Sequence, residues 1–107
     1  MSGIVVRHWQ AQVLRADLEA WIATFRARAL PGMKAVEGWL GISIDAARTD
    51  DPCAVTVTTR WKDEAALRRY AGDAPAKAVV PDFMSPFLVS FDPEATFRDE
   101  LVMESAR

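Results

Sequence analysis

Alternating apolar and polar positions near the start of the chain predict a β-strand over residues 4–13. Alternation of this kind, with β-branched residues, is typical of a strand that buries one of its faces. The two predicted faces carry Val5, Arg7, Trp9 and Ala11 on one side, and Val6, His8, Gln10 and Gln12 on the other.

The spacing of apolar residues then changes to that of a helix. Asp17 is a suitable N-cap residue. The apolar residues that follow share one helical face: Leu18, Trp21, Ile22, Phe25 and Ala29. This pattern predicts an amphipathic helix that packs on a sheet. The Pro31-Gly32 pair is predicted to close the helix, because both residues are frequent helix breakers.

Period-two patterns return in the middle of the chain. Apolar residues at every second position predict a second strand over residues 40–45 and a third over residues 54–61. Trp39 is assigned to the face of the second strand that also carries Gly41 and Ser43. One face of the third strand carries Val55, Val57, Thr59 and Trp61.

The last part of the chain contains a capped helix and several prolines. Asp63 can cap a short helix that ends at Gly72. The proline-bounded stretches 74–80 and 82–89 are predicted to form short helical turns. Residues 96–102 are predicted to form the last strand.

The resulting order, β-α-β-β-α-β, predicts an α+β fold with a ferredoxin-like antiparallel sheet. The length of 107 residues fits a single domain over residues 1–107. Helices on one face of such a sheet leave the other face uncovered. A two-fold homodimer that closes two sheets into an α+β barrel would cover that face.

Composition narrows the possible partners and the compartment. The net charge of −2 and the pI near 5.3 give no electrostatic reason to expect nucleic acid. The apolar runs are too short to span a membrane, and the opening residues lack a secretory pattern. A single cysteine, Cys53, suits a reducing compartment. A cytoplasmic protein without a membrane or nucleic-acid partner is therefore expected.

Candidate chemistry rests on three residues. His8, the only histidine, is a natural proton acceptor, but a lone strand histidine is also often a structural hydrogen-bonding residue. Tyr70, the only tyrosine, could orient a substrate oxygen or could simply pack between helix and sheet. Trp61 could line a pocket or fill the core.

These residues predict a cavity between sheet and helices that binds a small apolar or aromatic ligand. Its expected wall comprises Trp61, Val57, Arg7, Phe83 and Phe87, with His8 and Tyr70 nearby. Arg7 could neutralise an anionic substrate or pair with an acidic residue at the dimer interface. A one-residue slip in strand register would exchange His8 for Arg7 and Trp9. No clustered ligands point to a metal, and neither metal, flavin nor haem is expected as a cofactor.

Four motifs in order carry a resemblance to a known family: IVVRHW, LPGMKAVEGWLG, TRW and YAGDAPAKAVVP. With this order and spacing the chain resembles the antibiotic biosynthesis monooxygenase-like domains, which are dimeric α+β barrels. The resemblance implies a cofactor-independent monooxygenase that acts on a small aromatic or quinone-type metabolite. In such enzymes the deprotonated substrate itself reduces dioxygen, and Trp61 stands at the matching strand end. Oxygenase members tend to carry Asn where this chain has Val57, and this chain contains no Asn.

Two alternatives accompany this interpretation. The same domain could be a non-catalytic dimeric barrel that binds a small molecule, which the missing Asn favours. Haem-degrading relatives use an Asn, a Trp and a His on the helix after the Trp strand. Residues 64–80 contain no His, so the sequence does not support haem degradation.

Overall fold

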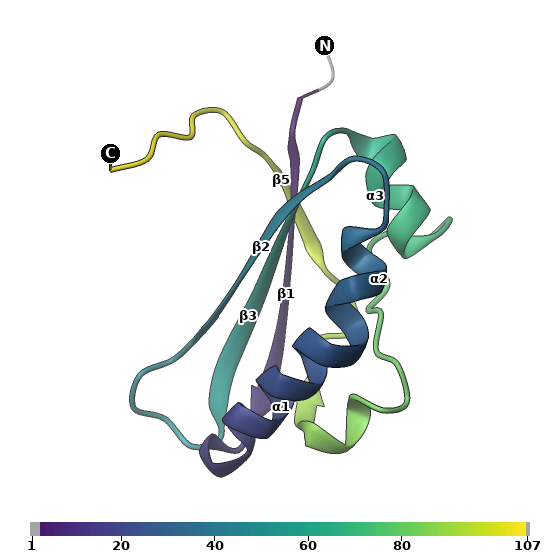
Figure 1. Cartoon of the computed structure of the whole chain (residues 1–107). Helices are drawn as coiled ribbons and strands as arrows, with labels where there is room; N and C mark the ends of the chain where they lie inside the picture. Colours follow the sequence, from purple (N-terminus) through teal and green to yellow (C-terminus); the bar gives the residue numbers. More distant parts are fainter. Residues whose placement is uncertain (1–2, 107) are drawn as a thin grey trace.

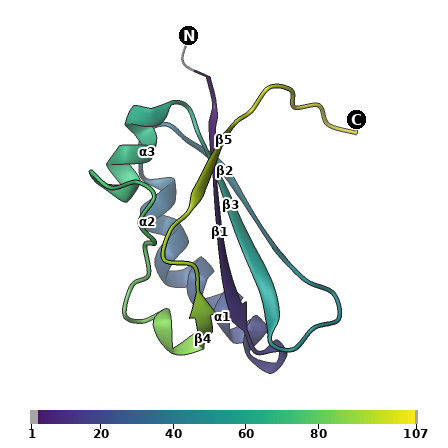
Figure 2. The same ribbon diagram turned by 180° about the vertical axis from the view of Figure 1, so that it is seen from behind.

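The computed structural model describes residues 3–106 and consists of a twisted antiparallel sheet with helices on one face (Figure 1). Figure 2 shows the opposite face, which no helix covers. In chain order the elements are β1 (Val5–Val13), η1 (Arg15–Asp17), α1 (Leu18–Thr24), η2 (Phe25–Ala29), α2 (Leu30–Lys34), β2 (Trp39–Ala46), β3 (Cys53–Trp61), α3 (Glu64–Ala71), η3 (Ser85–Phe87), β4 (Leu88–Phe91) and β5 (Thr96–Asp99).

The five strands have the order β2-β3-β1-β4, and β5 also pairs with β1. The strands β4 and β5 divide one edge of β1 between them: β4 pairs with Ala11–Val13 and β5 with Val5–His8. The chain between them contains Pro93, which has no backbone N–H to contribute to a ladder. The expected ferredoxin-like α+β sheet is confirmed, with its last strand split in two and ending at Asp99 rather than at residue 102.

Pairing between β1 and β3 determines which side chains lie under the helices. Arg7 pairs with Thr59 and Trp9 pairs with Val57. On β3 every second residue is buried, from Cys53 to Trp61. Because paired residues point to the same face, Arg7 and Trp9 lie on the helix-covered side of the sheet. His8, the one residue between them, lies on the open side.

The helix after β1 is longer than predicted. The elements α1, η2 and α2 form one long helical segment over residues 18–34, so the expected closure at Pro31-Gly32 is wrong. The Leu30 N–H donates to the carbonyl of Phe25, five residues earlier, which is the bonding of a π turn. Pro31 therefore lies in the first turn of α2, where a missing N–H costs little.

The bulge at the start of β2 corrects the placement of Trp39. The β2–β3 register shifts between Trp39 and Gly41, and Trp39 pairs with Trp61. The Trp39 side chain therefore packs against the core under the helices, not on the open face. A local period-two pattern cannot reveal such a bulge, because the extra residue breaks the alternation.

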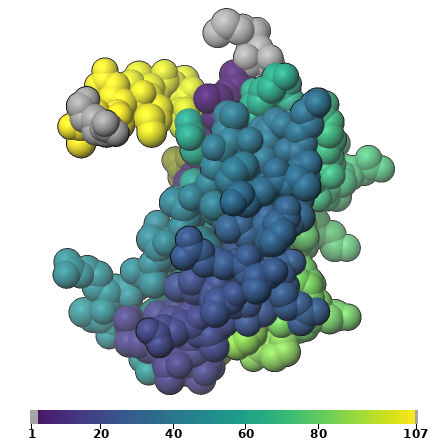
Figure 3. All heavy atoms as spheres, in the orientation of Figure 1, coloured from purple at the N-terminus to yellow at the C-terminus, as the bar shows by residue number. Residues whose placement is uncertain are grey.

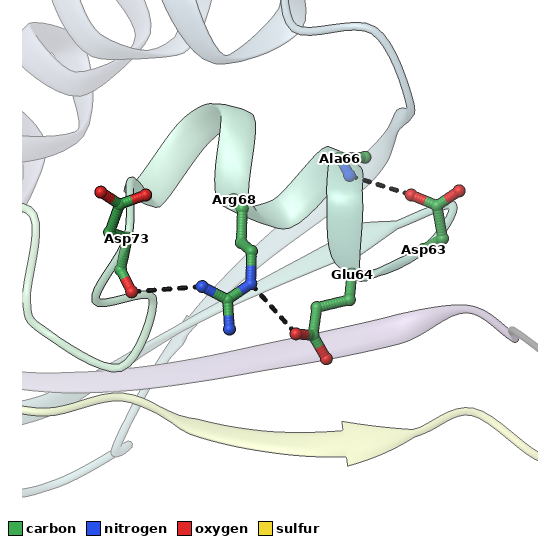
Figure 4. A network of polar contacts seen from close by, with 5 residues as sticks. All are labelled: Asp63, Glu64, Ala66, Arg68 and Asp73. Carbon is green, nitrogen blue, oxygen red and sulfur yellow. Dashed lines mark hydrogen bonds and ion pairs between the residues drawn. The ribbon is translucent and has the colours of Figure 1, made fainter.

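Helix α3 begins and ends as predicted. The Asp63 carboxylate accepts a hydrogen bond from the Ala66 N–H at 2.9 Å, and Gly72 ends the helix with a φ of 83°. Arg68 donates to Glu64 at 3.0 Å and to the carbonyl of Asp73 at 3.2 Å (Figure 4). The bond to Asp73 connects α3 to the start of the segment that follows it.

The predicted helical turns at 74–80 are wrong. This stretch is an irregular connection in which Lys77 forms an isolated bridge with Glu94, and the Ala78 N–H donates to Pro93 at 2.9 Å. In 82–89 only Ser85–Phe87 is a 3-10 turn, and β4 begins directly after it. The prolines remove helical donors, so the backbone pairs with distant partners. No helix within residues 3–106 is long and apolar enough to cross a membrane.

Candidate functional site

A cavity of about 290 Å³ lies on the helix-covered side of the sheet, between the long helical segment and residues 79–88. Its lining is mainly aromatic and aliphatic. The sheet contributes Trp9, and the long helical segment contributes Trp21, Phe25 and Met33. A small, mostly apolar hollow with few polar groups is the usual form of a small-molecule site.

One side of this cavity is formed by residues 79–81, at the end of the irregular connection after α3. Val79, Val80 and Pro81 all line the cavity. Met84 lines it deeper in the core, where only 4% of its surface is exposed. We refer to residues 79–81 below as the cavity wall.

Helix α3 delivers Tyr70 to the cavity lining. Its ring stacks on Trp61, with ring centroids 5.1 Å apart and 22° between the planes. Burial raises the pKa of the Tyr70 phenol, and the charge of Arg7 offsets part of that rise. The phenol is therefore protonated at neutral pH, where it can donate a hydrogen bond to a ligand oxygen.

Trp61 lies behind Tyr70, and its side chain is fully buried. The indole Nε1 donates to Thr59 Oγ1 at 2.9 Å. Trp61 is not among the residues that line the cavity, so the structure places it as the support of Tyr70 instead of as a wall.

Arg7 also lies under the helices without lining the cavity. Only 5% of its surface is exposed. Its Nε donates to the carbonyl of Pro75 at 3.2 Å and its Nη2 to the carbonyl of Lys77 at 3.0 Å. The guanidinium carbon lies 6.0 Å from the centre of the Tyr70 ring. Burial lowers the pKa of Arg7, and the group remains a cation at neutral pH.

His8 lies on the opposite, open face of the sheet, so the expectation that it lies near Trp61 under the helices is wrong. Its Nδ1 lies 3.1 Å from Oγ1 of Thr58, its pairing partner on β3. It borders a polar depression on the open face together with Gln10 and Thr96. The physical reason is the strand alternation, which sends Arg7 and Trp9 to the helix side. A catalytic role for His8 stays a prediction, and it concerns this open face.

The three remaining predicted pocket residues lie in different places. Phe83 lines the cavity, and the Arg28 guanidinium lies over its ring at 4.1 Å from the centroid. Val57 is buried in the core next to Trp9 on the sheet, and Phe87 packs against the core outside the lining.

Sequence reasoning missed most of the aromatic lining. Trp21 and Phe25 lie on the apolar face of the predicted helix, so their periodicity could have identified them. Met33 lies beyond the predicted end of that helix, and Trp9 required the sheet register.

The arrangement can hold a flat apolar molecule and present one hydroxyl group to it. Among the described residues that line the cavity, the only charged one is Arg28 and none is acidic. Across residues 3–106, no three His, Cys, Asp or Glu side chains come together as a metal-ligand group.

Comparison with known proteins identifies the family. The model of the antibiotic biosynthesis monooxygenase family matches residues 4–82. No curated protein matches the chain.

Solved structures share the fold at low identity. A Streptomyces coelicolor monooxygenase from the gene ActVA-Orf6, in complex with nanaomycin D, has 21% identity and a TM-score of 0.68, covering 97% of this chain and 94% of its own. A conserved Methanosarcina mazei protein has 15% identity and a TM-score of 0.68, over 94% and 95% of the chains. A Bacillus cereus protein has 12% identity and a TM-score of 0.66, over 97% and 99%. By the match over residues 4–82, this chain belongs to the antibiotic biosynthesis monooxygenase family.

Proposed function

We propose that the protein binds a small aromatic or quinone-type molecule in the cavity beside Tyr70 and oxygenates it without metal, flavin or haem. The observation that carries the proposal is the apolar cavity whose lining includes the phenol of Tyr70. The family match supports a monooxygenase-like chemistry. The Streptomyces coelicolor relative, which binds nanaomycin D, supports a polycyclic ligand.

The proposed reaction converts a phenol and dioxygen into a quinone and water. The substrate phenolate supplies the electrons, one oxygen atom enters the ring as the new carbonyl, and the other leaves as water. The ring loses one C–H and one O–H proton, and these two protons enter the water. The protein's part is to orient the ring, exclude water and bind the substrate oxygen.

Tyr70 is the residue we assign to the substrate oxygen. Its raised pKa keeps it a donor at neutral pH, and its stacking on Trp61 holds the ring in one orientation. No histidine or carboxylate is among the described residues that line the cavity. The substrate therefore has to lose its proton to solvent, which favours acidic phenols.

A second candidate function is binding without catalysis. The missing proton acceptor in the cavity lining favours it, as does the absence of Asn from the chain. In this case the cavity would hold an apolar metabolite and leave it unchanged.

We further propose that the functional unit is a homodimer formed through the open face of the sheet. No helix covers that face, and the segment after β5 leaves the body there (Figure 2). Leu101, Val102 and Met103 in this segment are 89%, 79% and 61% exposed. Figure 3 shows the segment standing clear of the body. Three adjacent exposed apolar side chains are typical of an interface.

Oxygen uptake distinguishes the two candidate functions. The purified protein, treated with chelator and free of flavin, is mixed with a panel of hydroxynaphthalenes that carry a single hydroxyl group, and oxygen and quinone are both followed. We expect one dioxygen consumed per quinone formed, and a slower rate in Tyr70→Phe. Quenching of tryptophan fluorescence by the same compounds, without oxygen uptake, would instead establish binding alone. If neither signal appears, both candidates are wrong.

A further inference from the structure

We propose that Arg7 is a specificity-determining residue: it makes the cavity prefer anionic over neutral aromatic ligands, and it holds the cavity wall in place. It acts from behind the lining, as a positioning residue, without touching the ligand. This inference rests on the proposed binding of a ligand in the cavity beside Tyr70.

The first step concerns the isolation of the Arg7 charge. Its guanidinium is almost fully buried, and within residues 3–106 no carboxylate forms an ion pair with it. Its hydrogen-bond acceptors are the carbonyl groups of Pro75 and Lys77, which carry no net charge. Burying a cation without a counter-charge is costly, so most buried arginines are paired with an acid. Here the charge is left without a protein counter-ion.

The second step concerns the position of this charge relative to the cavity. Tyr70 lines the cavity, and its ring centre lies 6.0 Å from the Arg7 guanidinium carbon. Trp9, two residues along β1 on the same face, lines the cavity directly. For a ligand anion about 10 Å from the guanidinium, with an effective dielectric constant near 20, this unit charge raises the affinity by about tenfold or somewhat more. No acidic residue in the lining opposes this field.

The third step concerns the cavity wall. Pro75 and Lys77, the two acceptors of Arg7, lie two to six residues before Val79, Val80 and Pro81 in the chain. The prolines at 75 and 81 leave this stretch without a regular helix or strand of its own. The two hydrogen bonds from β1 therefore fix the wall against the sheet.

The two roles need different properties of the same side chain. The electrostatic preference needs only a positive charge, which lysine keeps. Holding two carbonyls needs the fork of the guanidinium, because lysine presents its donors from one atom. Methionine has a similar length and removes both properties. Arg7→Lys and Arg7→Met therefore separate the two effects.

The experiment uses two ligands with the same ring system. The probes are 2-hydroxy-1,4-naphthoquinone, an anion at neutral pH, and neutral 1,4-naphthoquinone. Dissociation constants are measured by quenching of tryptophan fluorescence for wild type, Arg7→Lys and Arg7→Met. Arg28→Met, which removes the charged residue of the cavity lining, is measured in the same way. We expect wild type to bind the anion about tenfold more tightly than the neutral quinone. Arg7→Lys should keep this ratio while binding both probes more weakly, and Arg7→Met should lose the ratio.

Different results would overturn different parts of the account. If wild type binds neither probe, the proposed ligand site is wrong and Arg7 has no such role. If wild type binds both but Arg7→Met keeps the ratio, or Arg28→Met alone abolishes it, the ligand site stands and the Arg7 assignment is wrong.

A second measurement needs wild type alone and therefore covers the case in which Arg7→Met does not fold. The pKa of the bound hydroxynaphthoquinone, followed by its absorbance, should fall below that of the free compound, and an unchanged value would contradict the proposal.

Discussion

The ring of Tyr70 on helix α3 stacks on the indole of Trp61 at the end of strand β3, with centroids 5.1 Å apart. Tyr70 follows Trp61 by nine positions in the chain, and the capped turn at Asp63 brings the helix back over the strand. The stacking joins a core residue to a cavity residue. The position of the phenol therefore depends on the packing of the core. Substitution of either residue tests this relationship.

Replacement of Tyr70 by phenylalanine should keep the stacking and remove only the hydroxyl group. A ligand that accepts a hydrogen bond from the phenol should then bind about two- to twelvefold more weakly, since such a bond contributes about 0.5–1.5 kcal/mol. Binding of a hydrocarbon of the same shape, such as naphthalene, should not change. Titration by tryptophan fluorescence measures both affinities. An equal loss for both ligands would show that the hydroxyl makes no specific contact.

Removal of the Trp61 side chain should destabilise the whole domain. Trp61 is fully buried, and truncation of a buried aromatic residue costs about 3–5 kcal/mol. Trp61→Ala should therefore shift the urea unfolding midpoint strongly downward, as followed by circular dichroism. Leu40→Ala is the control, because 44% of the Leu40 surface is exposed and the variant should unfold close to wild type. Equal stability of the two variants would contradict the core role of Trp61.

The ionisation of Tyr70 gives a pH test with one reporter, because the chain contains a single tyrosine. Its pKa is raised in the folded protein above the ordinary value of 10.0. The unfolded chain therefore loses this proton first, so stability is complete below about pH 10 and falls as the pH rises toward the folded pKa. Phenolate absorbance should titrate above 10 in the native protein and near 10 in concentrated urea.

Two variants complete this pH test. In Arg7→Met the native pKa of Tyr70 should rise further, because the Arg7 charge lowers it in wild type. In Tyr70→Phe the loss of stability above pH 10 should be smaller than in wild type. A native Tyr70 that titrates at or below its value in urea would mean that the phenol is solvated and not buried.

Replacement of residues 101–103 by serine tests the proposed dimer. These side chains are largely exposed in one protomer, so the substitution should leave the folded monomer almost unaffected. If they contact a second copy, the dimer should weaken and the mass from light scattering should fall toward the monomer value of 11.9 kDa. Ile22→Ser, on the helix side and 38% exposed, is the matched control. Monomeric wild type at micromolar concentration would reject the dimer; an unchanged dimer in the serine variant would reject the role of this segment.

Local sequence signals predicted those elements that local interactions determine. Asp63 and Gly72 bound helix α3 in the structure as their chemistry predicts. The alternation on β3 correctly placed Val57, Thr59 and Trp61 on one face. The predicted helix end at Pro31 is wrong, because the π turn before it leaves Pro31 in the first turn of α2 and the helix continues to Lys34.

The cavity required information that no local pattern contains. The period of two showed that Arg7 and Trp9 share a face of β1, but pairing with Thr59 and Val57 decides that this face lies under the helices. His8 was therefore placed on the wrong side. The cavity wall could not be predicted because the stretch that leads into it, from residue 74 on, takes its partners from β1 and from the chain near Pro93, far away in sequence.

A crystal structure of the protein with 2-hydroxy-1,4-naphthoquinone tests the proposed ligand site most directly. We expect the ring between Tyr70 and Phe83 under the cavity wall, with an oxygen atom within hydrogen-bonding distance of the Tyr70 hydroxyl. Ligand found instead on the open face beside His8, with the cavity empty, would contradict it.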